Sequence, residues 1–243
     1  MNEKNNLLIP FSILSAGIVL SIIIFSFVWK SAKDADQTIT VTGSAKKLIT
    51  SDLGIQRGTL QVTSSDRKTA YQIVKQQMPS VIKYLEEKGF SKDDIEVFGI
   101  NGYAVFEVSP QGFQTQNVSH YVYSQVFEVR SKNIQKIKDL SVSLSSLVER
   151  GLDVQIDSPE YHYTKIDDLK IEIQSEATKN AITRAKRIAQ SAGMDIGSLR
   201  NARMGVIQIT PPNSTNISDY GMNDVSSIQK EITAVVSASF GID

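Results

Sequence analysis

Hydrophobic residues are distributed unevenly along the chain, with one long apolar run near its N-terminus. Residues 7–29 read LLIPFSILSAGIVLSIIIFSFVW and carry no charge. In a helix with a rise of 1.5 Å per residue, this run would be roughly 34 Å long, enough to cross a hydrocarbon core of about 30 Å. Pro10 falls in the first turn, where a missing N–H costs little, and Trp29 lies at the far end, where an indole suits the headgroup boundary. The run therefore predicts a transmembrane anchor.

Two other interpretations of this run compete with the anchor. A cleaved signal peptide has an apolar core of about 7–15 residues followed by small residues at the cleavage site, whereas this run is longer and ends in Trp29-Lys30-Ser31-Ala32-Lys33. A buried core helix is disfavoured by the length and uniform apolarity of the run. Length favours the uncleaved anchor, and the signal peptide stays open as the main alternative.

After a polar tether at residues 30–37, the pattern changes to short alternating runs. Segments rich in β-branched and aromatic residues are predicted as strands. They cover residues 38–42, 53–63, 95–108, 118–130, 152–164, 199–209 and 228–240. Gly43 is expected to end the first strand, Pro159 interrupts the fifth, and the turn residues 109–114 join the third and fourth into a long antiparallel hairpin.

Three segments have helical periodicity. The first follows capping candidates at residues 64–66 and runs to about Lys88, with a kink or break expected at Pro79. The second repeats apolar residues from Ile134 to Val148. The third covers residues 168–192 and has alanines at four-residue steps, which predicts close approach to a neighbouring element. These alanines are Ala177, Ala181, Ala185 and Ala189.

The order β-β-α-β-β-α-β-α-β-β predicts an α+β fold, with a largely antiparallel sheet and helices packed on one side, preceded by one N-terminal transmembrane helix. We divide the chain into a short tail at residues 1–6, the anchor at 7–29, the tether at 30–37 and one α+β domain at 38–243.

Composition excludes several classes of function. The chain has 26 basic and 26 acidic residues, and the segment before Lys30 holds one of each, so the body is neutral and no nucleic-acid partner is expected. The absence of cysteine excludes disulfides, thiolate metal sites and thiol nucleophiles.

The chain contains no phosphate-binding, dinucleotide-binding, nucleophile-elbow or zinc-protease motif. His120 and His162 lie in strand-like runs beside tyrosines, which is more typical of packed or surface strand residues than of ligands. One acidic group would suit a hard cation, although solvated strand ends and a helix N-terminus explain it more simply. Its members are Asp157, Glu160, Asp167, Asp168 and Glu172. We therefore predict no catalytic, cofactor-binding or metal-binding residue and expect no enzyme.

Two further features are candidates for contact surfaces. Tyr121, Tyr123 and Phe127 share one face of a predicted strand; with Tyr103 and Phe106 they form either a ligand surface or, as paired aromatics favour, a core or subunit contact. The polar loop 210–224 is the best candidate for partner contact, with a solvated loop as an equal alternative.

Several stretches together resemble the SIMPL-domain family of bacterial proteins. They are TITVTG at residues 38–43, YHYTKIDDLK at 161–170, the alanine-rich helix at 177–193, the strand GVIQI at 205–209 and ITAVVSASF at 232–240. Their order and spacing carry the resemblance, which covers roughly residues 37–240.

The resemblance implies an exported or membrane-anchored protein. Some members assemble into ring-like oligomers, some are associated with oxidative-stress tolerance, and no agreed catalytic residues exist to carry across. Lys30 and Lys33 weakly favour a cytoplasmic body by the positive-inside rule, but the resemblance implies an extracytoplasmic or periplasmic one, which we expect.

The sequence thus predicts a homo-oligomeric structural or interaction protein of the cell envelope, with the membrane as a partner through residues 7–29. The alternatives are a membrane-tethered sensor of an unidentified small ligand and an envelope hydrolase.

Overall fold

The computed structural model describes residues 8–35 and 37–242, so Leu7 and the predicted tail at residues 1–6 lie outside it. Contacts divide the chain into two compact units. Unit 1 comprises residues 1–46, 170–207 and 233–243, and unit 2 comprises residues 47–169 and 208–232. This division does not test the predicted α+β domain at residues 38–243, and its boundaries remain a prediction.

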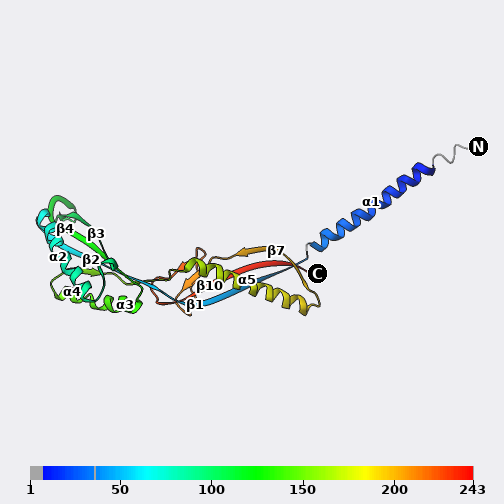
Figure 1. The fold of residues 1–243 in the computed structure, drawn as a ribbon. Coiled ribbons are helices and arrows are strands. Elements are labelled where there is room, and N and C mark those ends of the chain that lie inside the picture. The colour runs from blue at the N-terminus through cyan, green and yellow to red at the C-terminus, as the bar shows by residue number, and fades with distance from the viewer. Residues whose placement is uncertain (1–7, 36, 243) are drawn as a thin grey trace, which may run out of the picture. The chain divides into compact units, whose positions relative to one another are not determined.

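The apolar run forms α1 (Leu8–Ala35), drawn in blue in Figure 1. Its stretch Phe11–Lys30 has a mean hydropathy of 2.5 and is unburied, so this helix is long and apolar enough to be a transmembrane span or a signal sequence. The helix continues to Ala35 and thus takes in most of the predicted polar tether.

Unit 1 packs α5 (Ile166–Ser191) against β1 (Thr38–Thr50) and β10 (Gln229–Ile242); β1, β10 and α5 contribute residues to both units. The predicted alanine stripe is fully buried, and two of its members form a small core with Val41, Ala238 and Phe240. A Cβ on Gly43 would lie 2.3 Å from the Ala177 carbonyl oxygen. The expectation that Gly43 ends the first strand is therefore wrong, because this glycine continues the strand and admits the helix backbone.

Unit 2 contains an antiparallel sheet in the order β3-β4-β2-β5, with β6 also paired to β2. Its strands are β2 (Leu53–Ser64), β3 (Ile95–Val108), β4 (Gln114–Ser131), β5 (Val154–Ile156) and β6 (Glu160–His162). Its helices are α2 (Arg67–Glu87), the 3-10 turn η1 (Lys92–Asp94), α3 (Ile134–Ser143) and α4 (Ser146–Glu149). The helices bury one continuous core with one face of the sheet, as Figure 1 shows for α2 beside β2 and β4.

Two glycines in this sheet lie under aromatic rings of the neighbouring strand. Gly58 pairs with Phe127 and Gly102 with Tyr123, and a Cβ on either glycine would lie 2.5 Å from the facing ring. These rings therefore cover backbone that a side chain would otherwise occupy. Phe127 is fully buried and Tyr123 packs against the core, while Tyr103 is 61% exposed. The aromatic group thus divides between the core and the surface of the hairpin.

A second sheet has the order β1-β10-β8-β9, with β7 paired to β10. Its other strands are β7 (Ile196–Met204), β8 (Gln208–Thr210) and β9 (Met222–Asn223), and β8 and β9 run parallel. The α+β class with mainly antiparallel pairing is confirmed, and the strands form two sheets where a single one was expected.

Other differences follow from local chemistry. α2 runs without a break through Pro79, and Asp66 caps its N-terminus by accepting from the Thr69 N–H. The second predicted helix divides into α3 and α4. The predicted strand 199–209 divides into β7 and β8. In both cases the pattern of apolar residues continues through the division, but the backbone turns there.

Candidate functional site

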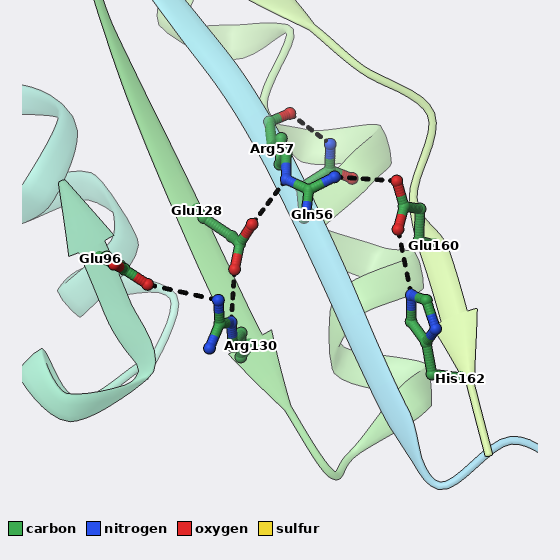
Figure 2. Close-up of polar contacts among 7 residues, drawn as sticks. All are labelled: Gln56, Arg57, Glu96, Glu128, Arg130, Glu160 and His162. Carbon is green, nitrogen blue, oxygen red and sulfur yellow. Dashed lines mark hydrogen bonds and ion pairs between the residues drawn. The ribbon is translucent and has the colours of Figure 1, made fainter. Parts of the chain in front are cut away.

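Charged side chains form a ladder across four strands of unit 2, on the sheet face opposite the helices. Arg57 on β2, Glu128 on β4 and Glu96 on β3 stand directly opposite one another in the strand register. Arg57 Nε donates to Glu128 Oε2 at 2.5 Å, and Arg130 contacts both Glu128 and Glu96 (Figure 2). Alternating charge thus offsets the repulsion that two facing glutamates would otherwise exert.

Glu128 lies at the centre of the ladder and is almost fully buried, with 2% of its side chain exposed. Burial alone would raise the pKa of this carboxyl, but hydrogen bonds from Arg130 and Arg57 outweigh it and lower the pKa. Glu128 therefore stays ionised at neutral pH as a structural anion between two guanidinium groups.

Gln56 occupies the helix-facing side of β2, next to Arg57, and is fully buried. Its Nε2 donates to the carbonyl oxygens of Arg57 and Asp157, at 2.8 and 2.7 Å (Figure 2 draws the first). Its Oε1 has no hydrogen-bond partner among the residues described. The amide therefore fixes the end of β5 to β2 at the cost of one unsatisfied acceptor.

The ladder continues from Arg57 to β6. Arg57 Nη1 donates to Glu160 Oε1 at 2.9 Å, and Glu160 Oε2 lies 3.0 Å from His162 Nε2 (Figure 2). His162 in turn lines a pocket of about 140 Å³ within unit 2. The pocket is bounded by Ile49, Tyr161, His162, Tyr163, Ile166, Ile209, Asn223, Asp224 and Lys230. One end of the ladder is thus a wall of this pocket.

Lys230 is the most unusual residue of the pocket, because its side chain is only 2% exposed. Its Nζ donates to the Asp224 carbonyl oxygen at 2.6 Å and lies 3.5 Å from Asp224 Oδ2. Burial lowers the pKa of Lys230 and outweighs the attraction of Asp224, which acts in the opposite direction. Burial by itself would raise the pKa of Asp224, but hydrogen bonds from Ser226 and its neighbours lower it. The pair therefore fixes the residue that follows β9 to β10.

A different feature, in unit 1, is suited to contact with another chain. β7 pairs with β10 along one edge and, among the residues described, has no strand on its other edge. All residues from Ser198 to Met204 are exposed, including Leu199 at 52% and Met204 at 54%. An edge strand presents unpaired N–H and C=O groups that can template another strand.

The other edge strand of unit 1 is covered at two of its backbone groups. The β1 groups Ser44 N–H and Thr42 C=O are bonded by α5 side chains: Asn180 Oδ1 accepts from the amide at 3.2 Å, and Arg184 Nη1 donates to the carbonyl at 2.9 Å. Residues two apart present their groups along the same strand edge. The two side chains therefore obstruct strand addition at β1, and β7 is left as the accessible edge.

The candidates named from the sequence do not converge on one centre. His120 Nδ1 lies 3.1 Å from the hydroxyl of the neighbouring Ser119, whereas His162 joins the ladder through Glu160. Within the described ranges, no three acidic or histidine residues gather closely enough to hold a metal ion. The loop 210–224 contributes Asn223 and Asp224 to the pocket.

Sequence reasoning missed Lys230 and Tyr161 as site residues. A usable signal was present for Lys230, because it falls in phase with the buried positions Ile232, Ala234 and Val236 of β10. A lysine at a position that the alternation assigns to the buried face is expected to be buried and to have a polar partner.

No curated protein matches this chain. The sequence model of one family matches residues 39–240, and that family is described as SIMPL, protein of unknown function (DUF541). The match covers both units apart from α1 and confirms the resemblance found in the sequence motifs. The chain belongs to the SIMPL family.

Proposed function

We propose that this chain is a membrane-anchored protein that self-associates through the open edge of β7, and that it acts by assembly and not by catalysis. The observation that carries the proposal is an edge strand that is exposed from Ser198 to Met204, whereas α5 side chains obstruct the other edge strand at Thr42 and Ser44. A second copy of the chain supplies an identical edge, so two β7 strands can pair around a two-fold axis.

Arg200 and Arg203 restrict the register of such a pair, because like charges directly opposite one another destabilise a sheet. An antiparallel pair centred on Asn201 or Ala202 keeps the arginines of the two copies out of direct opposition. A pair centred on Arg200 or Arg203 would place that arginine opposite its own copy, whereas Arg200 and Arg203 lie on opposite faces of the strand and cannot oppose each other. Near the middle of the exposed segment 198–204, the favoured register therefore has its axis at residue 201 or 202.

Membrane attachment by α1 supports the proposal, since copies confined to one membrane meet at a higher effective concentration. We place the body outside the cytoplasm, in the cell envelope, following the family resemblance. A contribution to stress tolerance would then come from an assembly at the membrane.

Cysteine cross-linking tests the proposal directly, because the chain contains no native cysteine. We expect Asn201→Cys or Ala202→Cys in the full-length protein to form a disulfide-linked dimer on mild oxidation, since residues at the two-fold axis come within disulfide range. Ser80→Cys on the exposed surface of α2 is the matched control and should stay monomeric on denaturing gels. Equal cross-linking at all three positions, or none at residues 201 and 202, would contradict self-association through β7.

A further inference from the structure

The pocket of unit 2 has features of a built binding site that the proposed assembly does not use. Lys230 and Tyr161 are 2% and 5% exposed, and both side chains line the pocket. The ammonium has three N–H donors, of which two directions are taken by the Asp224 contacts. Burial raises the pKa of the Tyr161 hydroxyl, and it is the only cause that acts on this group. The ammonium and the hydroxyl can therefore both donate to a ligand at the same cavity.

The size and lining of the pocket restrict what it can hold. A volume of about 140 Å³ is well below the roughly 300–1,000 Å³ of pockets that hold a nucleotide or a drug-sized ligand. Ile49, Ile166 and Ile209 supply the apolar part of the pocket wall. This combination suits a molecule with one polar end and a very short aliphatic part.

The charge of the polar end follows from the partners of Lys230. Its short hydrogen bond is to a neutral carbonyl oxygen, while the Asp224 carboxylate lies 3.5 Å away and already accepts from the Ser226 N–H and hydroxyl at 2.9 and 2.7 Å. The Ser226 bonds are both to Asp224 Oδ1, whereas Oδ2 forms the ion pair with Lys230, so a ligand carboxylate would share the ammonium with Asp224. Charge-assisted hydrogen bonds to a carboxylate are stronger than neutral ones, so the N–H that the Asp224 contacts leave over suits such a group.

We propose that this pocket binds a small aliphatic monocarboxylate of two to four carbons, with its carboxylate at Lys230 Nζ and the Tyr161 hydroxyl. The aliphatic part then contacts the isoleucines. His162 and Tyr163 complete the wall, and His162 couples the pocket to the charge ladder through Glu160.

Binding of propionate to the full-length protein in detergent, measured by calorimetry and by the shift in unfolding temperature, tests this proposal. We expect saturable binding at one site, and Tyr161→Phe should weaken it by at least about tenfold, the usual effect of losing a hydrogen bond to a charged group. Tyr103→Phe, on the exposed part of β3, is the matched control and should leave binding unchanged. Lys230→Met should abolish binding, with circular dichroism showing that the variant is folded.

Three comparisons separate the monocarboxylate from other ligands. Asp224→Asn should tighten propionate binding, because it removes the anion that competes for Lys230. Glycine tests whether a zwitterion is preferred, and inorganic phosphate tests whether any anion suffices. Tighter binding of glycine or phosphate than of propionate, no saturable propionate binding, or equal affinity in Tyr161→Phe would each overturn the proposal. None of these outcomes bears on association through β7, which cross-linking reports separately.

Discussion

At the scale of single residues, Glu128 has the most specific surroundings in unit 2, because its carboxylate is buried between two guanidinium groups. Glu128→Gln removes the charge but keeps the shape. We expect it to lower the free energy of unfolding by about 1–3 kcal/mol, since Arg57 and Arg130 are 41% and 53% exposed and can be solvated in its absence. Denaturant unfolding of the full-length wild-type protein and variant in detergent measures this difference in the free energy of unfolding.

The control is Glu96→Gln at the exposed end of the same ladder, where loss of a surface ion pair should cost about 0–1 kcal/mol. An equal effect of the two substitutions would show that burial of Glu128 contributes nothing to stability.

The same residue predicts a pH dependence. Because the pKa of Glu128 is lower in the folded protein than in the unfolded chain, the unfolded chain binds more protons as the pH falls below the usual carboxylate range. The stabilisation is therefore present at neutral pH and is lost as the pH falls through the lowered pKa. Glu128→Gln should flatten this part of the stability profile relative to wild type, and an unchanged slope would contradict the assignment.

The sequence indicated part of this residue-level picture. It placed His162 and Glu160 on a strand but offered no reason to join them to Arg57, because their partners come from strands more than a hundred residues apart in the chain. Lys230 and Tyr161 share a pocket for a similar reason: Tyr161 lies on β6, which pairs with β2, and Lys230 lies on β10, which pairs with β8 in the other sheet. Contacts between residues far apart in the chain bring them together, and no local pattern encodes them.

At the scale of elements, packing of α5 on β1 depends on Gly43. Gly43→Ala would place a methyl group 2.3 Å from the Ala177 carbonyl oxygen and 2.4 Å from the Ala181 nitrogen, so the helix must move away. We expect a loss of about 1–3 kcal/mol and faster hydrogen exchange in β1 and α5. Gly99→Ala on β3 is the control, because a Cβ there meets nothing within 4 Å. Equal exchange rates in the two variants would contradict the close approach.

A second prediction at this scale concerns the covered edge of β1. Asn180→Ala combined with Arg184→Ala frees the Ser44 N–H and the Thr42 C=O, so the edge becomes available for strand pairing. Light scattering should show faster, concentration-dependent association than for wild type. The matched control, Thr183→Ala with Arg187→Ala, changes exposed residues of the same helix and should behave like wild type.

The elements themselves were largely predictable from periodicity. α2, α5 and the β3–β4 hairpin were found within a few residues, because each has a strong repeat or a turn signal. The prediction for Gly43 was wrong, because the sequence does not distinguish a glycine that ends a strand from one that lets a helix pack closely against the strand. The division into two sheets depends on which long strands pair, and that is decided by tertiary contacts.

At the scale of the whole molecule, the fate of α1 separates the anchor from the signal peptide. We expect the intact mass of the protein isolated from cells to include residues 7–29, and the protein to stay with membranes after an alkaline wash, because an apolar helix of this length does not leave the bilayer. A mass beginning near residue 30, with the protein recovered in the soluble fraction, would establish cleavage.

The central claim, that copies associate through β7, is tested most directly by the mass of the full-length particle in lipid nanodiscs. We predict more than one copy per particle, and fewer for Leu199→Lys, which places like charges on the pairing edge. Leu48→Lys, at a comparably exposed leucine of β1, should not change the copy number. A single copy per particle at every protein concentration, or equal masses for the two lysine variants, would contradict the account.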